Sequence, residues 1–280
     1  MATASSDETG DELPAYAGLL KSFHQEFAPE LRSLVSKLPL TMGNRVLEVA
    51  TGDGQFAVWL SERVGAAGSV TAMDISNAWL REAHRTIDKD GGERISLEQA
   101  DATRLPYDDG SFDFVWCAQS LYSLPRLQAC FAEMQRVVRP GGFVAILEND
   151  SLHHVLLPWP VDLELQLLAA ELRAFRATAS QPAKFYVGRW LSRLMRHNGF
   201  RRVQERSFAY TRQQPLMAAA EEYFACHLSA LSERVTPWLK PKALYRFQQL
   251  IDPSSRRCLW KQPDFVAVCI DRVVWGEKCA

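Results

Sequence analysis

The chain has 280 residues, 47% of them hydrophobic and 23% charged, so it is long enough to bury a sizeable core as one enlarged domain or a domain with a cap. Its 32 basic residues nearly balance its 33 acidic residues, and a net charge of -1 provides no field that would attract nucleic acid or an anionic membrane surface. Charge or proline interrupts every apolar segment before it reaches the length that crosses a bilayer. These bounds favour a soluble globular protein with no nucleic-acid partner and no membrane insertion.

The N-terminus and the cysteines indicate the compartment. Residues 1–12 are small, polar and acidic, without the basic and apolar regions of a signal peptide, and we expect a disordered tail there. The 6 cysteines are scattered without close pairing, which argues against a disulfide scaffold or a zinc site. No close group of histidine, aspartate or glutamate at ligand spacing lies near the predicted strand ends, so we expect no metal. Together these features predict a reducing, cytoplasmic setting.

Helix and strand patterns alternate along the first half of the chain. The apolar residues of Phe23–Leu38 recur at helical spacing, and Pro39 closes that run. Short apolar runs then alternate with helical stretches as far as Glu148. The predicted strands are Arg45–Ala50, Ser69–Met73, Ile95–Gln99, Phe112–Cys117 and Gly142–Glu148, and the predicted helices between them are Phe56–Val64, Ala78–Lys89 and Leu127–Val138.

The rhythm changes after Asp150. Long amphipathic helices now dominate, and strand patterns become sparse. The expected elements are a helix over Val161–Thr178, a helix over Val187–Asn198 that stops at Gly199, a strand over Arg201–Tyr210, a helical block over Leu216–Leu250 broken by Pro237 and Pro241, and a last strand over Asp264–Val274.

This order predicts an α/β fold with a doubly wound, Rossmann-like, seven-stranded and mostly parallel sheet. A helical segment precedes the sheet, and a helical cap is inserted late, between the last two strands. We expect residues 13–150 to hold the N-terminal helices and the ligand-binding core, and residues 151–280 to hold the cap interleaved with those strands. In such folds ligands bind at the carboxyl ends of the strands, so the loops there are the candidate site.

A glycine turn follows the first predicted strand. Gly52 to Ala57 satisfies the G-x-G-x-x-G/A pattern of dinucleotide-binding turns, a weak signal by itself, because these glycines could merely make a tight turn. Asp53 lies between Gly52 and Gly54, and Glu48 precedes them. Two carboxylates disfavour a pyrophosphate and suit a ligand that carries an ammonium and a sulfonium. The turn therefore favours S-adenosylmethionine over a nicotinamide dinucleotide.

Two further carboxylates follow the next strands. Asp74 ends the second strand, where it could accept hydrogen bonds from both ribose hydroxyls of either cofactor. Asp101 follows the third strand, where it could accept from an adenine amine. Both could instead be helix N-caps, a common use of aspartate after a strand.

Taken together, these segments make the sequence resemble class I S-adenosylmethionine-dependent methyltransferases, nearest to the small-molecule group that includes ubiquinone and menaquinone biosynthesis enzymes. Their order and spacing follow the family from about Arg45 to Glu148. The segments that carry the resemblance are Val46–Gly54, Met73–Ser76, Asp101–Ala102, Leu105–Asp113 and Val137–Gly142.

The resemblance implies a role for each matching residue. Glu48, Ala50, Gly52 and Gly54 would surround the methionine part, Asp74 and Ile75 the ribose and adenine, Asp101 and Ala102 the adenine edge, and Gln119 the methionine end through its backbone. The sequence departs from the family at two places. Ala50 replaces the first loop glycine, and Tyr122 and Ser123 stand where a histidine often follows the fourth strand.

The acceptor side has no fixed signature, because methyl transfer is a direct displacement that mainly needs alignment and exclusion of water. If the acceptor is a hydroxyl, His153 or His154, just beyond the fifth strand, is the candidate base; a solvent-facing pair is the alternative. Tyr16, Phe23 and His24 lie on the helical region that covers cofactor and acceptor in similar enzymes, or they only pack.

These inferences predict methyl transfer from S-adenosylmethionine to a small natural-product or quinone-like acceptor, leaving S-adenosylhomocysteine. No Asn/Asp-Pro-Pro-Tyr motif supports methylation of a nucleobase or protein amide. The cap would enclose an apolar pocket lined by Trp159, Phe185 and Tyr186. The alternatives are an NAD-dependent oxidoreductase and a non-catalytic methyltransferase-like binding protein. We expect a monomer or homodimer.

Overall fold

The computed structural model of the chain describes residues 12–92, 94–179 and 181–279. Apart from Glu12, the expected N-terminal tail lies outside the described residues. None of the helices in these ranges is long and apolar enough to cross a membrane.

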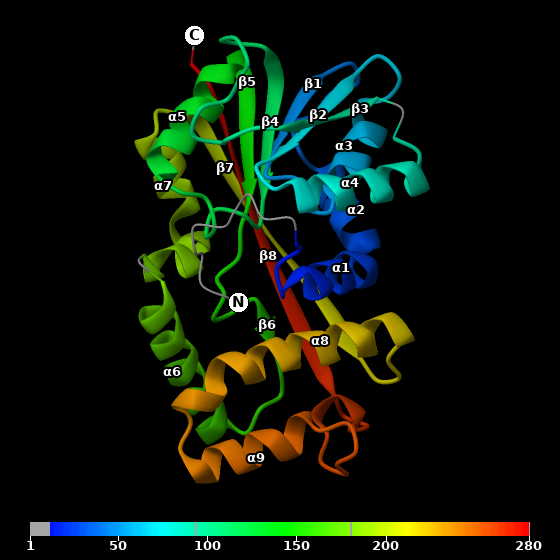
Figure 1. Cartoon of the computed structure of the whole chain (residues 1–280), viewed down its shortest axis with the longest axis vertical. Helices are drawn as coiled ribbons and strands as arrows, with labels where there is room; N and C mark the ends of the chain where they lie inside the picture. The colour runs from blue at the N-terminus through cyan, green and yellow to red at the C-terminus, as the bar shows by residue number, and fades with distance from the viewer. Residues whose placement is uncertain (1–11, 93, 180, 280) are drawn as a thin grey trace.

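A mixed sheet forms the centre of the molecule (Figure 1). Five parallel strands stand in the order β3-β2-β1-β4-β5, followed by β8, which is antiparallel to β5 and to β7. The seven predicted strands and the doubly wound fold are confirmed, and a two-residue strand, β6, adds to them. The strands are β1 (Arg45–Val49), β2 (Ser69–Asp74), β3 (Ile95–Gln99), β4 (Phe112–Ala118), β5 (Val138–Leu147), β6 (Val155–Leu156), β7 (Arg201–Gln213) and β8 (Val266–Glu277).

Helices cover both faces of the sheet, and alternation along the strands shows why. Phe114 and Trp116 of β4 pack in one core with α2 (Ala28–Ser36) and α3 (Gln55–Val64). Val115 and Cys117 face the other core with α5 (Leu127–Val137) and α7 (Leu191–His197). All four of these β4 side chains are fully buried, which fits a parallel strand covered on both sides. The helix α4 (Asn77–Asp90) packs beside α3.

The predicted N-terminal helix over Phe23–Leu38 is wrong in its extent. The structure has two helices there, α1 (Ala17–Glu26) and α2, separated at Phe27. Pro29 lies in the first turn of α2, where its missing N–H and fixed φ fit a helix start but would interrupt a helix interior. The break turns the chain so that α2 packs on α3 while α1 crosses toward the cap.

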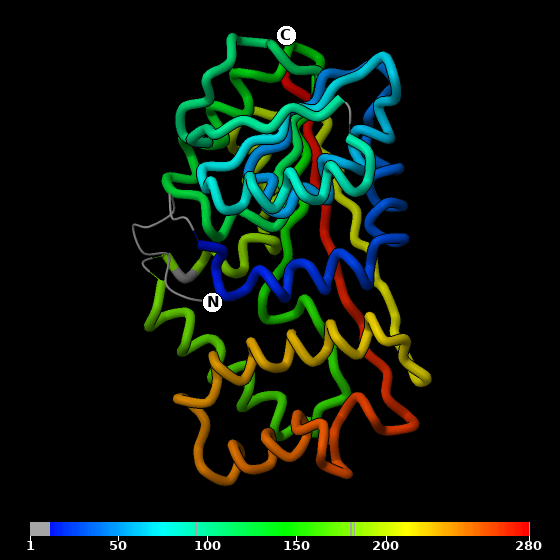
Figure 2. Tube along the Cα trace, turned by 45° about the vertical axis from the view of Figure 1, so that its right-hand side comes forward, coloured from blue at the N-terminus to red at the C-terminus, as the bar shows by residue number. Residues whose placement is uncertain are grey.

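The cap lies beyond the carboxyl ends of the parallel strands, with α1 between it and the sheet (Figures 1 and 2). It consists of α6 (Val161–Thr178), α8 (Ala218–Val235) and α9 (Pro241–Ile251), with short 3₁₀ segments at Thr236–Trp238 and Leu259–Lys261. The insertion of α8 and α9 between β7 and β8 agrees with the sequence.

The predicted helix over Val187–Asn198 is only partly helical. A 3₁₀ segment covers Pro182–Trp190 and is kinked at Tyr186, and the α-helix begins at Leu191. A Cβ on Gly188 would lie 2.8 Å from the backbone of Asn149, so this stretch is shaped by its close approach to the chain that follows β5.

Candidate functional site

The backbone turns sharply where β1 and β4 end, and these two neighbouring strands define the site. Ala50 and Gln119 follow them with φ of 58° and 51°, in the left-handed region that non-glycine residues rarely adopt. Hydrogen bonds hold both turns, because Thr51 N donates to Met73 O at 2.9 Å and Gln119 N to Leu147 O at 2.7 Å. β1 is also the point where the strand order reverses, the position at which such sheets bind ligands. Backbone strain of this kind clusters at binding sites.

The glycine turn fits closely between α1 and α4. Gly52 has a φ of +56°, and a Cβ there would lie 3.6 Å from Leu20 of α1. Gly54 has a φ of +76°, and a Cβ there would lie 2.9 Å from the Cα and Cβ of Ala83 on α4. Both glycines are therefore required by conformation, and Gly54 by space as well.

Acidic side chains line this turn. Glu48 is 2% exposed and accepts a hydrogen bond from Thr51 Oγ1 at 2.7 Å. Burial, with added repulsion from Asp53 and Asp74, raises the pKa of Glu48 to about 8. A cation placed here would favour the ionised carboxylate, whereas a pyrophosphate would meet three acidic side chains and repulsion. The turn therefore fits the cationic groups of S-adenosylmethionine.

Asp74 joins the glycine turn to the end of β2. Its Oδ2 accepts from Gly52 N and its Oδ1 from Ser76 N, each at 3.0 Å, and burial raises its pKa. The N-cap of α4 is Ser76, whose hydroxyl accepts from Trp79 N. Asp74 is therefore not a helix cap, and the remaining lone pairs of its carboxylate are available to a ligand. The neighbouring Ile75 accepts from the side chain of Gln99 at 3.0 Å.

Asp101 lies on the same edge, after β3. It is exposed, and its Oδ1 accepts from Thr103 N at 2.7 Å, which forms a local turn. Its second oxygen stays available, and Ala102 beside it is buried. The local turn thus uses one carboxylate oxygen of Asp101. The contact between Asp101 and adenine stays a prediction.

The helix α1 covers the glycine turn. His24 is buried, and its Nδ1 lies 2.8 Å from Oδ2 of Asp53. The Tyr16 ring lies against Trp79 of α4, with ring centroids 6.0 Å apart and the planes tilted by 38°. The Nε2 of His24 is buried and has no partner among the described residues. The buried His24–Asp53 pair thus fixes the N-terminal helix to the glycine turn. A buried nitrogen such as His24 Nε2 costs free energy when it has no hydrogen-bond partner.

His153 and His154 point to different surroundings. His153 Nδ1 lies 3.1 Å from both Asp150 Oδ2 and Arg189 Nη2, and Arg189 also donates to Asp150. His154 packs edge-on against Phe23 of α1, with ring centroids 5.3 Å apart. The two histidines are therefore anchored separately and do not act as one pair.

The surroundings of His154 contain buried polar groups without hydrogen bonds. Its Nε2 lies 3.6 Å from Oδ1 of Asp271, which is an ion-pair distance rather than a hydrogen bond. Asp271 is fully buried, and neither of its carboxylate oxygens has a hydrogen-bond partner within the described part of the chain. The Asp271 carboxylate helps burial to raise the pKa of Tyr210.

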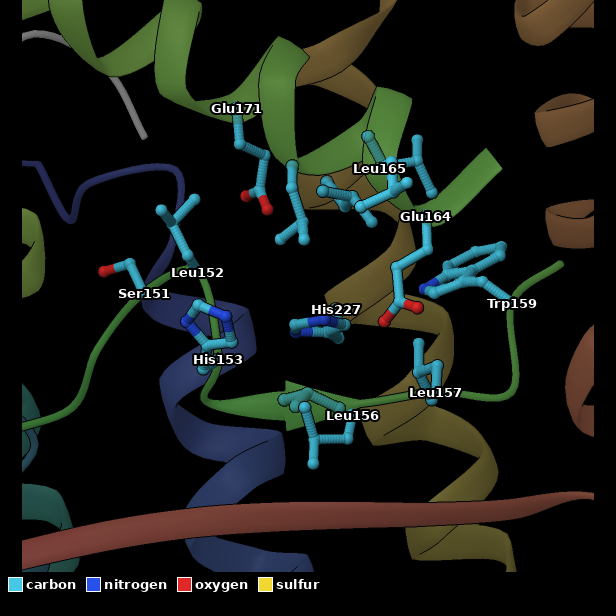
Figure 3. Close-up of a pocket in the computed structure, with 14 residues that line it drawn as sticks. Ser151, Leu152, His153, Leu156, Leu157, Trp159, Glu164, Leu165, Glu171 and His227 are labelled. Carbon is cyan, nitrogen blue, oxygen red and sulfur yellow. The ribbon is translucent and has the colours of Figure 1, made fainter. Parts of the chain in front are cut away.

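A cavity of about 250 Å³ separates the cap from the chain that follows β5 (Figure 3). Trp159 lines it as the sequence predicts, but Phe185 and Tyr186 do not. Phe185 stacks on Phe175 with ring centroids 4.2 Å apart. The ring planes of Tyr186 and Phe175 make an angle of 65°. These aromatic side chains therefore stabilise the cap rather than line the cavity.

The sequence reasoning missed several polar residues of the cavity, among them Glu164, Glu171 and His227. Each lies within an amphipathic helix, where the pattern reveals a buried face but not which polar side chain points into it. Within the described ranges, no three His, Cys, Asp or Glu side chains come together as metal ligands.

Comparisons with known proteins agree with this geometry. Residues 46–142 match a family model described as a methyltransferase domain. Methyltransferase GfsG of Streptomyces halstedii is 38% identical over 116 residues, which cover 41% of this chain and 41% of that protein. The ubiquinone/menaquinone biosynthesis C-methyltransferase UbiE of Pseudomonas putida is 32% identical over 170 residues, which cover 58% of this chain and 66% of that protein. The chain thus spans less than two thirds of the length of either relative.

A solved structure extends the likeness to nearly the whole chain. The YcgJ protein of Bacillus subtilis has a TM-score of 0.55 and is 15% identical, and the match covers 90% of this chain and 99% of that one. At this identity the likeness shows the fold alone.

The fold, the acidic glycine turn and the family match define a class I S-adenosylmethionine-dependent methyltransferase domain. The resemblance found in the sequence is confirmed. The cofactor of this domain is S-adenosylmethionine, and its relatives include methyltransferases of small molecules.

Proposed function

We propose that the protein transfers the methyl group of S-adenosylmethionine to a small natural-product or quinone-like acceptor, releasing S-adenosylhomocysteine. The observation that carries the proposal is the switch point of the sheet, where Glu48, Asp53 and Asp74 surround a turn whose two glycines have positive φ and which has no room for a side chain at Gly54. The name of the UbiE relative supports a small organic acceptor, since that protein acts in quinone biosynthesis.

We propose that the cofactor is held as the sequence predicts. Asp74 would accept from the ribose hydroxyls, and Glu48 would face the ammonium of the methionine part. The turns in left-handed conformation would present backbone groups to the same part. The complete set proposed is Glu48, Ala50, Gly52, Gly54, Asp74, Ile75, Asp101, Ala102 and Gln119.

The bound cofactor supplies an activated methyl group, and the protein needs only to orient the acceptor, exclude water and remove a proton. His153 is suited to the last role, because it lines the cavity and its Nδ1 lies at hydrogen-bond distance from Asp150. The role of base requires the tautomer in which Nδ1–H donates to Asp150, rather than the one in which Nδ1 accepts from Arg189; in the first, the Nε2 lone pair is free for an acceptor hydroxyl. His154, beside Asp271, is the second candidate base.

We also propose that residues 13–150 bind the cofactor and that residues 151–280 select the acceptor. The predictions of a monomer or homodimer and of a cytoplasmic setting belong to this proposal.

Calorimetric titration of the purified protein with S-adenosylhomocysteine, S-adenosylmethionine and NAD tests the proposal. We expect the first two to bind and NAD not to bind. Binding of NAD alone would replace the proposal with the oxidoreductase alternative. If the S-adenosyl ligands bind but no acceptor in a broad screen consumes S-adenosylmethionine, the non-catalytic binding protein becomes the better interpretation.

A further inference from the structure

The cavity beneath the cap is lined by leucine, valine and tryptophan side chains together with polar groups, and its exposed lining is about as polar as it is apolar. Figure 3 shows Ser151, Leu152 and His153 at one end, Trp159 at the other, and His227 between them. Ser151 lies four residues beyond Leu147, the last residue of β5, so this end of the cavity is formed by the segment that leaves the carboxyl edge of the sheet. Leucine and valine side chains from α6, α8, β6 and the residue after β6 form most of the remaining wall: Val155, Leu156, Leu157, Leu165, Leu167, Leu168 and Leu231.

His227 is the polar group best placed to meet a ligand in this cavity. It projects from α8 into the cavity, and none of the hydrogen bonds among the described residues involves its ring nitrogens. Burial, with help from the charges of Arg234 and His154, lowers its pKa to about 3. The imidazole is therefore neutral at physiological pH, with one nitrogen to donate and one to accept.

The acidic groups of the cavity make it unsuitable for anions. Glu171 is buried, and its Oε1 pairs with Nη2 of Arg234 at 3.0 Å, which satisfies that charge within the protein. Glu164 also lines the cavity and points its carboxylate into it (Figure 3). An anionic ligand would lose its hydration and meet the Glu164 carboxylate, and Arg234 would not compensate for this because it already pairs with Glu171.

We propose that this cavity is the acceptor site, and that it takes an uncharged, largely apolar molecule of about two fused rings whose oxygen hydrogen-bonds to His227. The size follows from the volume, since an apolar cavity of about 150 Å³ holds benzene and this one measures about 250 Å³. His227 determines specificity, and His153, at the end formed by the segment that follows β5, is the base. This inference rests on the proposed function, because it supplies the acceptor of the same reaction.

Calorimetry on the full chain with 1-naphthol as the probe tests the proposal, with 1-naphthoate as its anionic counterpart. Titrations are made with S-adenosylhomocysteine present. Leu231→Trp fills the cavity from α8, His227→Leu removes the hydrogen bond, and Tyr245→Ala on the exposed side of α9 is the matched control. Far-ultraviolet circular dichroism and the melting temperature check that each variant folds.

We expect 1-naphthol to bind the wild-type protein and the Tyr245→Ala control alike. Leu231→Trp should abolish binding, and His227→Leu should weaken it by about three- to tenfold, the equivalent of one neutral hydrogen bond. 1-Naphthoate should bind at least about tenfold more weakly than 1-naphthol.

Binding of 1-naphthol that survives Leu231→Trp in a folded protein would overturn the proposal, as would failure of the wild-type protein to bind it or a preference for 1-naphthoate. Affinity for S-adenosylhomocysteine is measured separately in every variant. If it is normal while naphthol does not bind, only the cavity assignment fails; if it is absent in the wild-type protein, the proposed function itself fails.

Discussion

The cofactor edge and the cap are built in different ways. At the cofactor edge, backbone geometry sets the site: Ala50 and Gln119 lie in left-handed turns, and Gly54 has positive φ and no room for a Cβ. In the cap, side chains set the site, through the Glu171–Arg234 pair and the polar groups that face the cavity. The difference indicates that the edge is adapted to one invariant ligand, whereas the cap can be altered residue by residue to suit its acceptor.

The largest effect is expected at the meeting point of the two regions. His153→Gln should lower kcat by about 10²- to 10⁴-fold with an acceptor that carries a hydroxyl, because general base catalysis is lost. Affinity for S-adenosylhomocysteine should stay unchanged, since His153 lies on the cap side. Steady-state kinetics and calorimetry measure the two quantities. If His153→Gln lowers kcat less than His154→Gln does, then His154, beside Asp271, is the base instead.

The cap depends on a buried ion pair. Arg234→Met should lower the free energy of unfolding by about 3 kcal/mol, because Glu171 is then left buried without its partner. The double variant Glu171→Gln/Arg234→Met should recover at least half of that loss. Thermal or urea denaturation followed by circular dichroism measures both. Equal stability of the single variant and the wild type would show that this pair does not hold α6 to α8.

The cofactor edge depends on a glycine. Gly54→Ala should lower the free energy of unfolding by about 2–3 kcal/mol and weaken S-adenosylhomocysteine binding, because the new Cβ is strained by φ and meets Ala83. Gly91→Ala is the matched control, since Gly91 also has a positive φ of +83° but open space around it. The control should cost about 1 kcal/mol and leave binding intact. Similar binding by both variants would argue against a closely fitted turn.

The effect of Glu48 on stability depends on pH and is absent in acid. Its pKa of about 8 in the folded state exceeds the ordinary value of 4.5, so the folded protein holds this proton where the unfolded chain releases it. Its contribution to stability is therefore neutral below about pH 4.5 and becomes unfavourable as the pH rises toward 8.

Glu48→Gln should remove this penalty in the cofactor-free protein. The variant should match the wild type at acidic pH and exceed its stability above pH 8 by up to about 5 kcal/mol, since each pKa unit corresponds to about 1.4 kcal/mol. Melting temperatures at pH 5 and 8.5 measure the difference. If the difference in melting temperature between Glu48→Gln and the wild type shrinks as the pH rises, the raised pKa of Glu48 is contradicted.

The cofactor half could be predicted from the sequence more completely than the cap. In the parallel core, local patterns and tertiary packing agree: β3 has its predicted bounds, and α4 differs by a residue at each end. The break at Phe27 depends on Pro29, a signal that was present in the sequence but outweighed by the helical spacing of the flanking apolar residues.

The features of the cap region that could not be predicted depend on contacts between residues far apart in the sequence. β6 is two residues long and exists through its pairing with β8, and the 3₁₀ segment before α7 follows from its packing against Asn149. His227 has no local signal, since its neutral state and its place in the cavity arise from elements far away in the sequence.

The most direct test of the central claim is the affinity of Asp74→Ala for S-adenosylhomocysteine, measured by calorimetry beside Asp88→Ala as an exposed control on α4. Asp74→Asn is added because it retains one acceptor for the Gly52 and Ser76 amides. The edge site predicts a loss of at least about tenfold in Asp74→Ala, equivalent to the charge-assisted hydrogen bonds removed, and no change in Asp88→Ala. Undiminished affinity in folded Asp74→Ala would show that the cofactor is not bound at this edge.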